Sequence, residues 1–381
     1  MITEPFSTFN FFLALTVLLI PAIILGLKEK RSFIYELFFT AIILIIVFFN
    51  EPRDGLTLSG YALFLNLLCK TFLLIINKKK YYLILWLFIF LSLIPLFISR
   101  ISSQWFLLGL SYMTFRAIQI IIESYNNLIK EISFIETLYF LLFAPAISAG
   151  PIDRSRRFLK DQNAMRTKDD YEILLKKGIF KVFLGIAYKF IFGLLIYHFW
   201  LSPISKSPTV LNSINYMYAY SFYLFFDFAG YSLIAIGVSN ILNYDFPENF
   251  NLPFISKDIK EFWNRWHLTL SFWLRDFLYT PLVMFLLKKK FFKSRYTASY
   301  IGYITTMTVM GLWHGFTIYY TLYGLYHGLL LVLNDLLEQK TGWYRNFRDS
   351  KTGTVILIFI CFNLVAFGFL LFSGYNFKNG K

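Results

Sequence analysis

The sequence predicts an all-α, polytopic integral membrane protein. Of its 381 residues, 57% are hydrophobic and only 15% are charged, whereas charged residues make up about 25% of an average soluble domain. The hydrophobic residues form repeated continuous runs of roughly 20 residues, which is the length that crosses a hydrocarbon core about 30 Å thick. A transmembrane β-barrel would alternate apolar with polar residues, so we predict membrane-spanning helices.

The formal net charge of +15 does not indicate a nucleic-acid partner. The basic residues stand in short clusters between apolar runs, a pattern that orients basic loops toward the cytoplasm. Cys69 and Cys361 both lie inside apolar runs, so we predict neither a disulfide framework nor a cysteine metal site. No basic region precedes the first apolar run, so we expect no cleavable signal.

The first apolar runs alternate across the membrane. Basic clusters at residues 28–31 and 78–80 follow the first and third runs, so both are expected in the cytoplasm and the N-terminus outside. The fifth run contains Arg116, which is unfavourable at membrane depth unless it is paired or hydrated. We favour a structural role for Arg116 over a substrate contact. The five runs are Phe11–Leu27, Phe33–Phe49, Leu56–Ile76, Tyr81–Ser99 and Trp105–Ile122.

The segment Ile132–Ile152 cannot be a simple crossing. It begins at an inside loop, yet it leads into the strongly basic residues 154–177, which also belong inside. Pro145 and a Gly-Pro pair at 150–151 interrupt any helix here. We therefore predict a broken or re-entrant segment, which is tolerated where protein or water surrounds the backbone. Ser148 lies on this segment and is predicted to line a tunnel.

The second half of the chain contains a second segment that cannot be a simple crossing of the membrane. Ile214–Ile241 returns to the inside and holds Asp227, which is either a functional acid or a hydrogen-bonded structural one. Trp266–Leu287 begins and ends at inside loops, so we predict a second broken segment. In total we expect ten to twelve crossings. The last one would leave the C-terminus outside, whereas the two lysines near the end of the chain favour the inside, so the side of the C-terminus stays open. The remaining runs are Ile179–Leu201, Ile301–Trp313, Thr317–Leu337 and Val355–Phe372.

Histidines are the strongest candidates for chemistry, because imidazole moves protons near neutral pH. His314 stands beside Trp313 between two glycines, where a bulky ring can exclude water. His267 lies at the second broken segment, so the two histidines form either an acid/base pair or part of a metal site. The absence of a short ligand spacing argues against zinc. His327 is a possible supporting partner, while His198 has the surroundings of an interfacial aromatic residue.

Several motifs in this chain occur together and in order, and they resemble those of the membrane-bound O-acyltransferase superfamily. The likeness extends from about Tyr139 to Asp335, and it is greatest to members that transfer D-alanine during teichoic acid decoration in Gram-positive bacteria. No Gly-x-Ser-x-Gly element of a serine hydrolase is present. The matching motifs are Gly150–Arg154, Phe262–Asp276, Trp313–Gly315, Tyr319–Gly328 and Asn334-Asp335.

The resemblance implies a ring of helices around a thin central partition in a bacterial plasma membrane. It implies that His314 is the catalytic histidine and that His267 is the second motif histidine. The implied donor is a D-alanyl thioester on the 4'-phosphopantetheine arm of a small acidic carrier protein, so the chain itself would bind no cofactor and no metal. The acceptor stays open between a membrane partner that relays D-alanine, lipoteichoic acid and a polysaccharide.

Further residues are assigned to the tunnel and to carrier docking. An apolar stretch followed by three lysines on the cytoplasmic side would hold and steer an acidic carrier, although a lipid-buried helix with a basic flank explains the same pattern. The docking residues are Val283, Met284, Phe285, Lys288, Lys289 and Lys290. The tunnel residues are Trp313, Ser148, Asp227, Asn264, Arg265, Asp276 and His327.

Two other functions are compatible with parts of this pattern. A polysaccharide O-acetyltransferase of the alginate type shares the Arg-Trp-His and Trp-His-Gly elements. A transporter or flippase would also have broken helices and buried polar residues, although no internal repeat is apparent. We divide the chain into N-terminal helices at 1–130, an acyltransferase core at 131–337 and a C-terminal loop and helix at 338–381.

Overall fold

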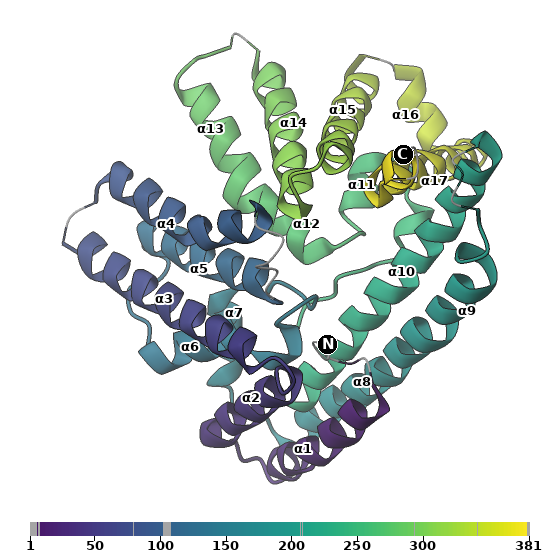
Figure 1. Ribbon diagram of the computed structural model, residues 1–381. Coiled ribbons are helices and arrows are strands. Elements are labelled where there is room, and N and C mark those ends of the chain that lie inside the picture. The colour runs from purple at the N-terminus through teal and green to yellow at the C-terminus, as the bar shows by residue number, and fades with distance from the viewer. Residues whose placement is uncertain are drawn as a thin grey trace. The chain divides into compact units, whose positions relative to one another are not determined.

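The computed structural model is built from helices (Figure 1). It describes residues 6, 8–78, 80–101, 108–205, 207, 209–292, 294–340 and 342–378. Trp105 and Lys79, which belong to a predicted span and a predicted basic cluster, lie outside these residues. No strand forms in the described ranges, so the all-α prediction is confirmed. The chain divides into two compact units: Met1–Ile186 with Gly230–Pro247, and Ala187–Ala229 with Glu248–Lys381.

Seven helical segments in the described part of the chain are long and apolar enough to cross a membrane. This confirms the prediction of a multi-pass membrane protein, while the total of ten to twelve crossings stays a prediction. Two further helices, α14 and α15, have 20 and 23 residues but are more polar than the seven. The seven segments are Phe9–Leu27, Pro52–Ile76, Tyr82–Ile101, Lys168–Leu201, Val210–Ile241, Leu268–Lys288 and Lys351–Ser373.

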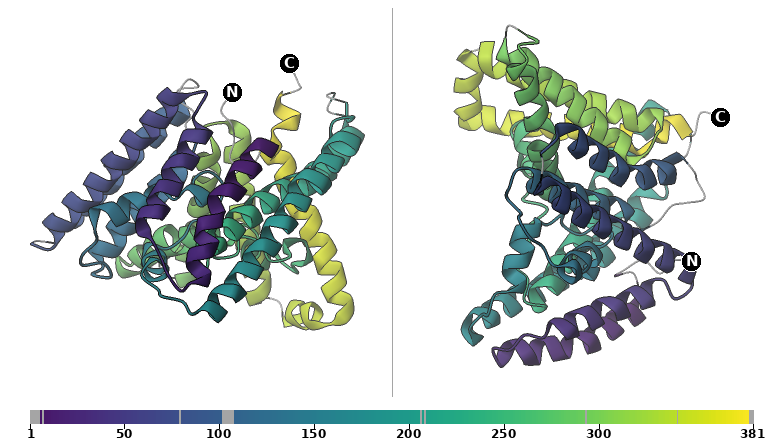
Figure 2. Two further views of the ribbon diagram at one scale, coloured as in Figure 1. Left: turned by 90° about the horizontal axis from the view of Figure 1, so that it is seen from below. Right: turned by 90° about the vertical axis from the view of Figure 1, so that its left-hand side faces the viewer.

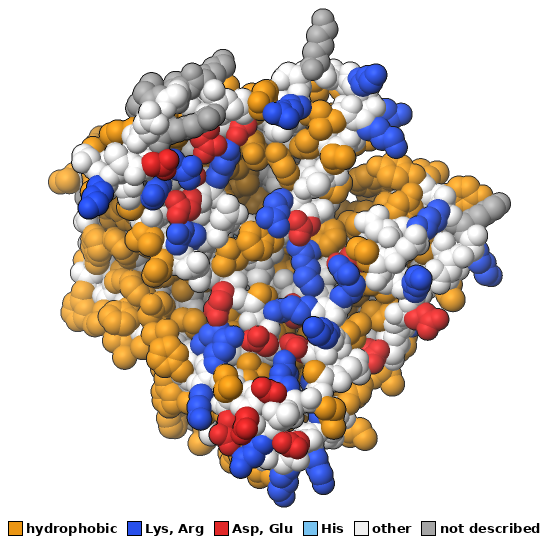
Figure 3. Space-filling view, turned by 180° about the vertical axis from the view of Figure 1, so that it is seen from behind, with side chains coloured by type: hydrophobic (Ala, Val, Ile, Leu, Met, Phe, Trp, Pro, Cys, Tyr) orange, Lys and Arg blue, Asp and Glu red, His pale blue; other side chains and the backbone are white. Residues whose placement is uncertain are grey.

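The surface agrees with a lipid environment. Large apolar side chains are as much as 81% exposed at Phe9 and Ile34 and 80% exposed at Phe199, and a lipid-facing surface accounts for such exposure on several different helices. Figure 3 shows one face with wide hydrophobic areas and with Lys, Arg, Asp and Glu side chains gathered in patches.

The first unit packs α3 against α4, α5 and α6, and α3 and α4 run side by side in Figures 1 and 2. Thr8 and Ser32 cap the first two helices by accepting hydrogen bonds from backbone N–H groups, as N-cap hydroxyls commonly do. The helices are α1 Phe9–Leu27, α2 Phe33–Val47, α3 Pro52–Ile76, α4 Tyr82–Ile101, α5 Leu110–Tyr125, α6 Phe134–Leu142, α7 Ser155–Gln162 and α8 Lys168–Ile186.

The first predicted break is present. Helix α6 ends at Leu142, a single tight turn follows at Ala144–Ala146, and the backbone stays non-helical until Ser155. Pro145 falls within that turn, as expected from its missing N–H group. Gly109, at φ 83°, lies against the break, because an added Cβ would stand 2.8 Å from the carbonyl oxygen of Ile147.

Arg116 of α5 holds this break together. Its guanidinium donates hydrogen bonds to the carbonyl oxygens of Phe140 at 2.8 Å, Leu141 at 3.2 Å and Ala146 at 2.8 Å. The side chain is fully buried. The last carbonyls of a helix have no partner within the helix, so Arg116 satisfies oxygens that the break leaves open. The structure therefore supports the structural role for Arg116.

The second unit differs from the prediction at Trp266–Leu287. Residues Leu268–Lys288 form one continuous helical segment, and the break precedes it, where His267 adopts φ 44°. Pro281 lies in the first turn of α13, directly after a wide π turn at Arg275–Tyr279. A π turn removes the clash that a proline ring otherwise makes with the preceding turn.

The other helices of this unit frame the candidate site. Helices α14 and α15 lie side by side, and α15 also packs against α11, α16 and α17 (Figure 1). The helix α10, Val210–Ile241, contributes its first part to this unit. The elements are α11 Ile259–Trp263, α12 Leu268–Leu274, α13 Thr280–Lys288, α14 Arg295–His314, α15 Ile318–Lys340, α16 Gly342–Asp349 and α17 Lys351–Ser373.

Candidate active site

His314 is the last residue of α14 and lies among aromatic rings. Its ring centroid is 4.4 Å from that of Trp313 and 4.8 Å from that of Phe372, which it meets edge to face at 88°. The ring of Tyr320 is 5.8 Å away. The imidazole is half-buried. Aromatic walls thus limit the access of water while one side of the histidine stays accessible, as a proton-transfer residue requires.

Glycines fix the position of His314 against α15. An added Cβ at Gly311 would stand 2.3 Å from the carbonyl oxygen of Tyr320, and one at Gly324 would stand 2.4 Å from that of Met307. No side chain fits at either position, so the two backbones approach each other directly. This close contact holds the end of α14 in one register relative to the first turns of α15.

His267 is buried and has a defined tautomer. Its Nδ1 lies 3.1 Å from Oδ1 of Asn249, and the same oxygen accepts bonds from the backbone N–H and hydroxyl of Thr269. A backbone N–H can only donate, so this Asn249 atom is the oxygen and Nδ1 of His267 carries the hydrogen. In the neutral ring, Nε2 then has a free lone pair. That nitrogen is buried without a hydrogen-bond partner among the described residues.

His327 of α15 is fully buried in an aromatic cage. Its ring lies 4.6 Å from that of Tyr323 and 5.2 Å from that of Trp263, and neither of its nitrogens has a hydrogen-bond partner in the described ranges. The backbone of Gly368 closes one side, because an added Cβ there would stand 2.4 Å from Nε2. Such an apolar cage favours the neutral imidazole.

Aromatic contacts connect the three histidines within the second unit. Phe372 contacts both His314 and Tyr323, and Tyr323 contacts His327. On the other side, a run of rings leads from His327 to His267. Its members are Phe262, Trp266, Phe250 and Phe228, with successive centroids 4.8 to 6.5 Å apart. The structure thus connects His267, His314 and His327, with Trp313, through one continuous run of rings, the histidine cluster, with His314 and His267 toward its two ends.

Other predicted tunnel residues have different surroundings. Asp227 forms an ion pair with Lys189, which gives it a structural partner. Ser148 belongs to the first unit and shares a hydrogen bond with the hydroxyl of Tyr231. The sequence offered no means of finding either partner, because each lies 38 or more residues away along the chain.

The polar residues next to His267 face outward. Asn264 is exposed. Arg265 is paired with Glu261 at 2.8 Å, and the partly exposed Asp276 is paired with Arg275 at 3.0 Å. These three residues therefore do not enter the histidine cluster, although all belong to the same motif.

The predicted docking segment is partly exposed. Met284 and Phe285 are 60% and 43% exposed, and all three lysines at 288–290 are exposed. Val283 is buried instead, because it packs against Gly302, where an added Cβ would stand 2.6 Å from its side chain. The exposed apolar part of the docking segment is thus Met284 and Phe285.

The Gly150–Arg154 motif contains a buried acid. Oδ1 of Asp153 accepts hydrogen bonds from Arg157 at 2.5 and 2.8 Å and from the backbone N–H of Arg154 at 2.6 Å. Burial raises the pKa of Asp153 to about 6, and the Arg157 guanidinium acts against that shift. The motif therefore connects the end of the broken segment to α7.

No group of three or more His, Cys, Asp or Glu side chains among the described residues is placed to hold a metal ion.

Sequence reasoning missed the residues that orient the site. Asn249 fixes His267 but stands in an irregular polar stretch without motif spacing. Lys260 lies one turn before Trp263 on α11, and its ammonium contacts Asp335 at 2.5 Å and Glu338 at 2.8 Å on α15. The sequence motif included Asn334-Asp335 of α15, but only the structure shows that Lys260 is the partner of Asp335.

We expect Lys260→Met to lower catalytic activity by about tenfold or more. Two carboxylates of α15 then lose the charge-assisted hydrogen bonds that hold α11 against α15, which contribute roughly 1.5–3 kcal/mol each. Lys260→Arg should retain most activity. Lys257→Met, three residues earlier, is the matched control. Initial rates and thermal unfolding of the three variants check this. Equal rates for Lys260→Met and Lys257→Met would contradict it.

Comparisons with known proteins cover nearly the whole chain. A sequence model described as MBOAT, membrane-bound O-acyltransferase family, matches residues 2–377. The chain is 42% identical to a teichoic acid D-alanyltransferase of Bacillus subtilis (strain 168), over 98% of this chain and 99% of that protein. It is 36% identical to the protein of the same name from Lacticaseibacillus rhamnosus, over 98% and 97%. A probable alginate O-acetylase of Pseudomonas syringae pv. tomato is 31% identical over 71% of this chain but only 49% of its own length.

Proposed function

Because this chain belongs to the membrane-bound O-acyltransferase family, we propose that it moves a D-alanyl group from a carrier-bound thioester across the membrane to a hydroxyl acceptor. It is an O-acyltransferase, and its reaction is D-alanyl transfer for teichoic acid. The observation that carries this assignment is the identity of 42% over essentially the full length of both chains. The alginate-type relatives match only about half of their own length.

His314 is the proposed general base. Its neutral imidazole takes the proton from the acceptor hydroxyl as the oxygen attacks the thioester carbonyl carbon. A C–O bond forms, the C–S bond breaks, and the carrier thiolate takes up a proton. Such general-base assistance typically contributes about 10²–10⁴-fold to the rate. The half-buried position of His314 among Trp313, Phe372 and Tyr320 supports this role.

His267 is the proposed proton relay. Asn249 fixes its tautomer so that Nε2 presents a lone pair, which is the arrangement needed to accept a proton on its way to the leaving thiolate. His327 is proposed to support the site by keeping a neutral ring packed between Trp263 and Tyr323. In this proposal Asp227, Asn264, Arg265 and Asp276 shape the surrounding helices and make no contact with substrate.

The proposed donor is the 4'-phosphopantetheine thioester of a small acidic carrier protein, and the chain itself binds no cofactor. The charge of the chain and the exposed Lys288–Lys290 beside Met284 and Phe285 support a docking surface for an acidic, partly apolar partner. The proposed acceptor is a hydroxyl of a membrane partner or of lipoteichoic acid. With basic loops inside, the N-terminus would lie outside the bacterial plasma membrane.

We expect reversal of Lys288, Lys289 and Lys290 to glutamate to weaken binding of the acidic carrier at least tenfold at low salt, because the lysines attract it electrostatically. The difference should shrink at high salt through screening. Reversal of three exposed lysines of the first unit, Lys28, Lys30 and Lys176, is the charge-matched control. Equilibrium binding in detergent checks this. Unchanged affinity at low salt would rule out docking at this segment.

Donor selectivity tests the proposed function. The protein in proteoliposomes is given carrier protein loaded with either a labelled D-alanyl or a labelled acetyl group, together with membranes that contain lipoteichoic acid. We expect acceptor labelling from the D-alanyl donor alone. Labelling from the acetyl donor alone would favour a polysaccharide-type O-acetyltransferase. Passage of free D-alanine without acceptor labelling would favour a transporter.

A further inference from the structure

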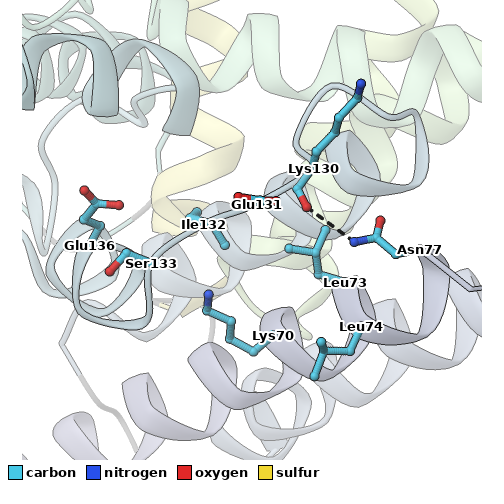
Figure 4. A pocket seen from close by; sticks show the side chains of 9 residues that line it. All are labelled: Lys70, Leu73, Leu74, Asn77, Lys130, Glu131, Ile132, Ser133 and Glu136. Atoms are coloured by element: carbon cyan, nitrogen blue, oxygen red, sulfur yellow. Dashed lines mark hydrogen bonds between the residues drawn. The ribbon is translucent and has the colours of Figure 1, made fainter.

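A pocket in the first unit is lined by other residues than those of the histidine cluster. It has a volume of about 680 Å³ and opens between α3 and the segment 130–136 that leads into α6 (Figure 4). Three of its lining residues come from α3, at positions 70, 73 and 74, and the cap residue Asn77 directly follows the helix. This spacing of three and four residues places them on one face of the helix.

Asn66 of α3 and Asn77, which caps the end of that helix, frame this pocket. Asn66 donates to the carbonyl oxygen of Phe134 at 2.9 Å, and Asn77 donates to that of Lys130 at 3.4 Å. The two asparagines belong to the same helix face and are separated by three turns, about 16 Å. The segment is therefore attached to α3 at both ends of the pocket, and Lys70 lies between the two attachments.

The pocket is lined by two positive and two negative side chains. Lys70 and Lys130, and Glu131 and Glu136, line it without a side-chain ion pair or hydrogen bond to another described residue. In Figure 4 the Lys70 ammonium points from α3 toward the segment that carries Ile132 and Ser133. Lys70 and Glu136 are partly buried, whereas Lys130 and Glu131 are exposed. Partly buried charged groups are stabilised by partners of opposite charge. A ligand with one positive and one negative group would supply both.

The pocket also lies at the end of a candidate membrane span, and the end of a span is the level at which lipid headgroups are expected. Helix α3 is one of the seven candidate membrane spans, and it ends at Ile76, next to the pocket. Leu73 forms a buried apolar wall, whereas Leu74 is 68% exposed on the outer side. A lysine one or two turns inside a helix end can extend its ammonium toward the interface. The pocket thus combines charged groups with an apolar edge that is open toward lipid.

We propose that this pocket binds the headgroup of a zwitterionic phospholipid that carries a phosphate and a primary ammonium. The phosphate pairs with Lys70, the ammonium donates to Glu136, and the first acyl carbons pack on Leu74. An anionic lipid without an amine would leave the Glu136 carboxylate unpaired. A choline headgroup could not donate hydrogen bonds to this carboxylate.

The test uses the full chain in detergent with phosphatidylethanolamine, phosphatidylcholine or phosphatidylglycerol added. Bound lipid is counted by native mass spectrometry, and the thermal unfolding temperature is followed in parallel. We expect phosphatidylethanolamine to bind about tenfold more tightly than phosphatidylcholine, because its ammonium donates charge-assisted hydrogen bonds that a choline group cannot donate. Lys70→Met and Glu136→Gln should each remove this preference. Glu172→Gln and Lys176→Met, from an exposed ion pair on α8, should keep it.

Each variant is compared with itself in two lipids, so a general loss of stability cannot imitate a loss of preference. The same preference in Lys70→Met as in the wild type would overturn the proposal. A preference for phosphatidylglycerol would also overturn it, because the pocket would then select an anionic headgroup. Soluble phosphoethanolamine is tested in the same way. If it raises the unfolding temperature as much as the lipid does, the site binds a small zwitterion and the lipid proposal is wrong.

Discussion

The His314→Ala variant is expected to transfer D-alanine about 10²–10⁴ times more slowly than the wild type, with unchanged affinity for the carrier. The imidazole is the proposed base for the acceptor hydroxyl, and the docking segment around Met284 and Lys288 belongs to a different helix. Loss of the base therefore affects the chemical step and leaves docking intact. The measurement is the initial rate of label transfer from D-alanyl carrier, alongside carrier binding.

His198→Ala is the matched control for this variant. His198 is exposed and contacts the neighbouring ring of Tyr197, so its removal should leave the rate unchanged. His267→Ala should lower the rate less than His314→Ala does, because a relay can be replaced by water more readily than the base itself. If the His314→Ala rate lies within a factor of two or so of the wild type, the base is another group.

The Arg116→Met variant is expected to lower the free energy of unfolding by at least about 3 kcal/mol. Three buried carbonyl oxygens, on Phe140, Leu141 and Ala146, lose their donor, and each unsatisfied buried group is unfavourable by roughly 1–3 kcal/mol. Total stabilities of proteins are only about 5–15 kcal/mol, so this loss is large. The broken segment should become sensitive to protease, and activity should fall with it.

Thermal unfolding in detergent and limited proteolysis check the Arg116 prediction. Lys177→Met is the control, because Lys177 and its partner Asp245 are 42% and 51% exposed at 2.7 Å, and such a surface ion pair contributes about 0–1 kcal/mol. Arg116→Lys should be intermediate, since one ammonium does not reproduce the planar set of guanidinium donors. An Arg116→Met protein that unfolds at the wild-type temperature would mean that solvent or other groups satisfy the three carbonyls.

The sequence was sufficient to predict the membrane helices and the first break. Apolar runs determine the helices because lipid leaves no other partner for the backbone, and Pro145 stops α6 locally. The donor that satisfies the freed carbonyls could not be predicted, because Arg116 lies 24 or more residues away along the chain. The sequence indicated only that an arginine at membrane depth needs polar partners.

The second break shows the limit of counting crossings. Loop charges indicated that Trp266–Leu287 was unusual, but they did not locate the interruption, which lies at His267 with its positive φ. The wide turn at Arg275–Tyr279 that accommodates Pro281 has no local sequence signal. Likewise, the burial of Val283 depends on Gly302 of another helix, so the apolar pattern alone did not separate it from Met284.

For the site, the motifs were sufficient to nominate His267, His314 and His327, because few other side chains in an apolar chain can move a proton. Their connection through Phe372 and Tyr323 depends on the packing of α14, α15 and α17. The orientation of His267 by Asn249 also required the fold, since the two residues meet across an irregular segment.

The central claim is tested most directly by transfer between the two faces of one membrane. Proteoliposomes receive labelled D-alanyl carrier on one face, while the hydroxyl acceptor is present only on the other. Our account predicts that label appears on the acceptor with the wild type, and that His314→Ala leaves it on the carrier although the carrier still binds. Undiminished labelling with His314→Ala, or labelling only when donor and acceptor share a face, would contradict the account.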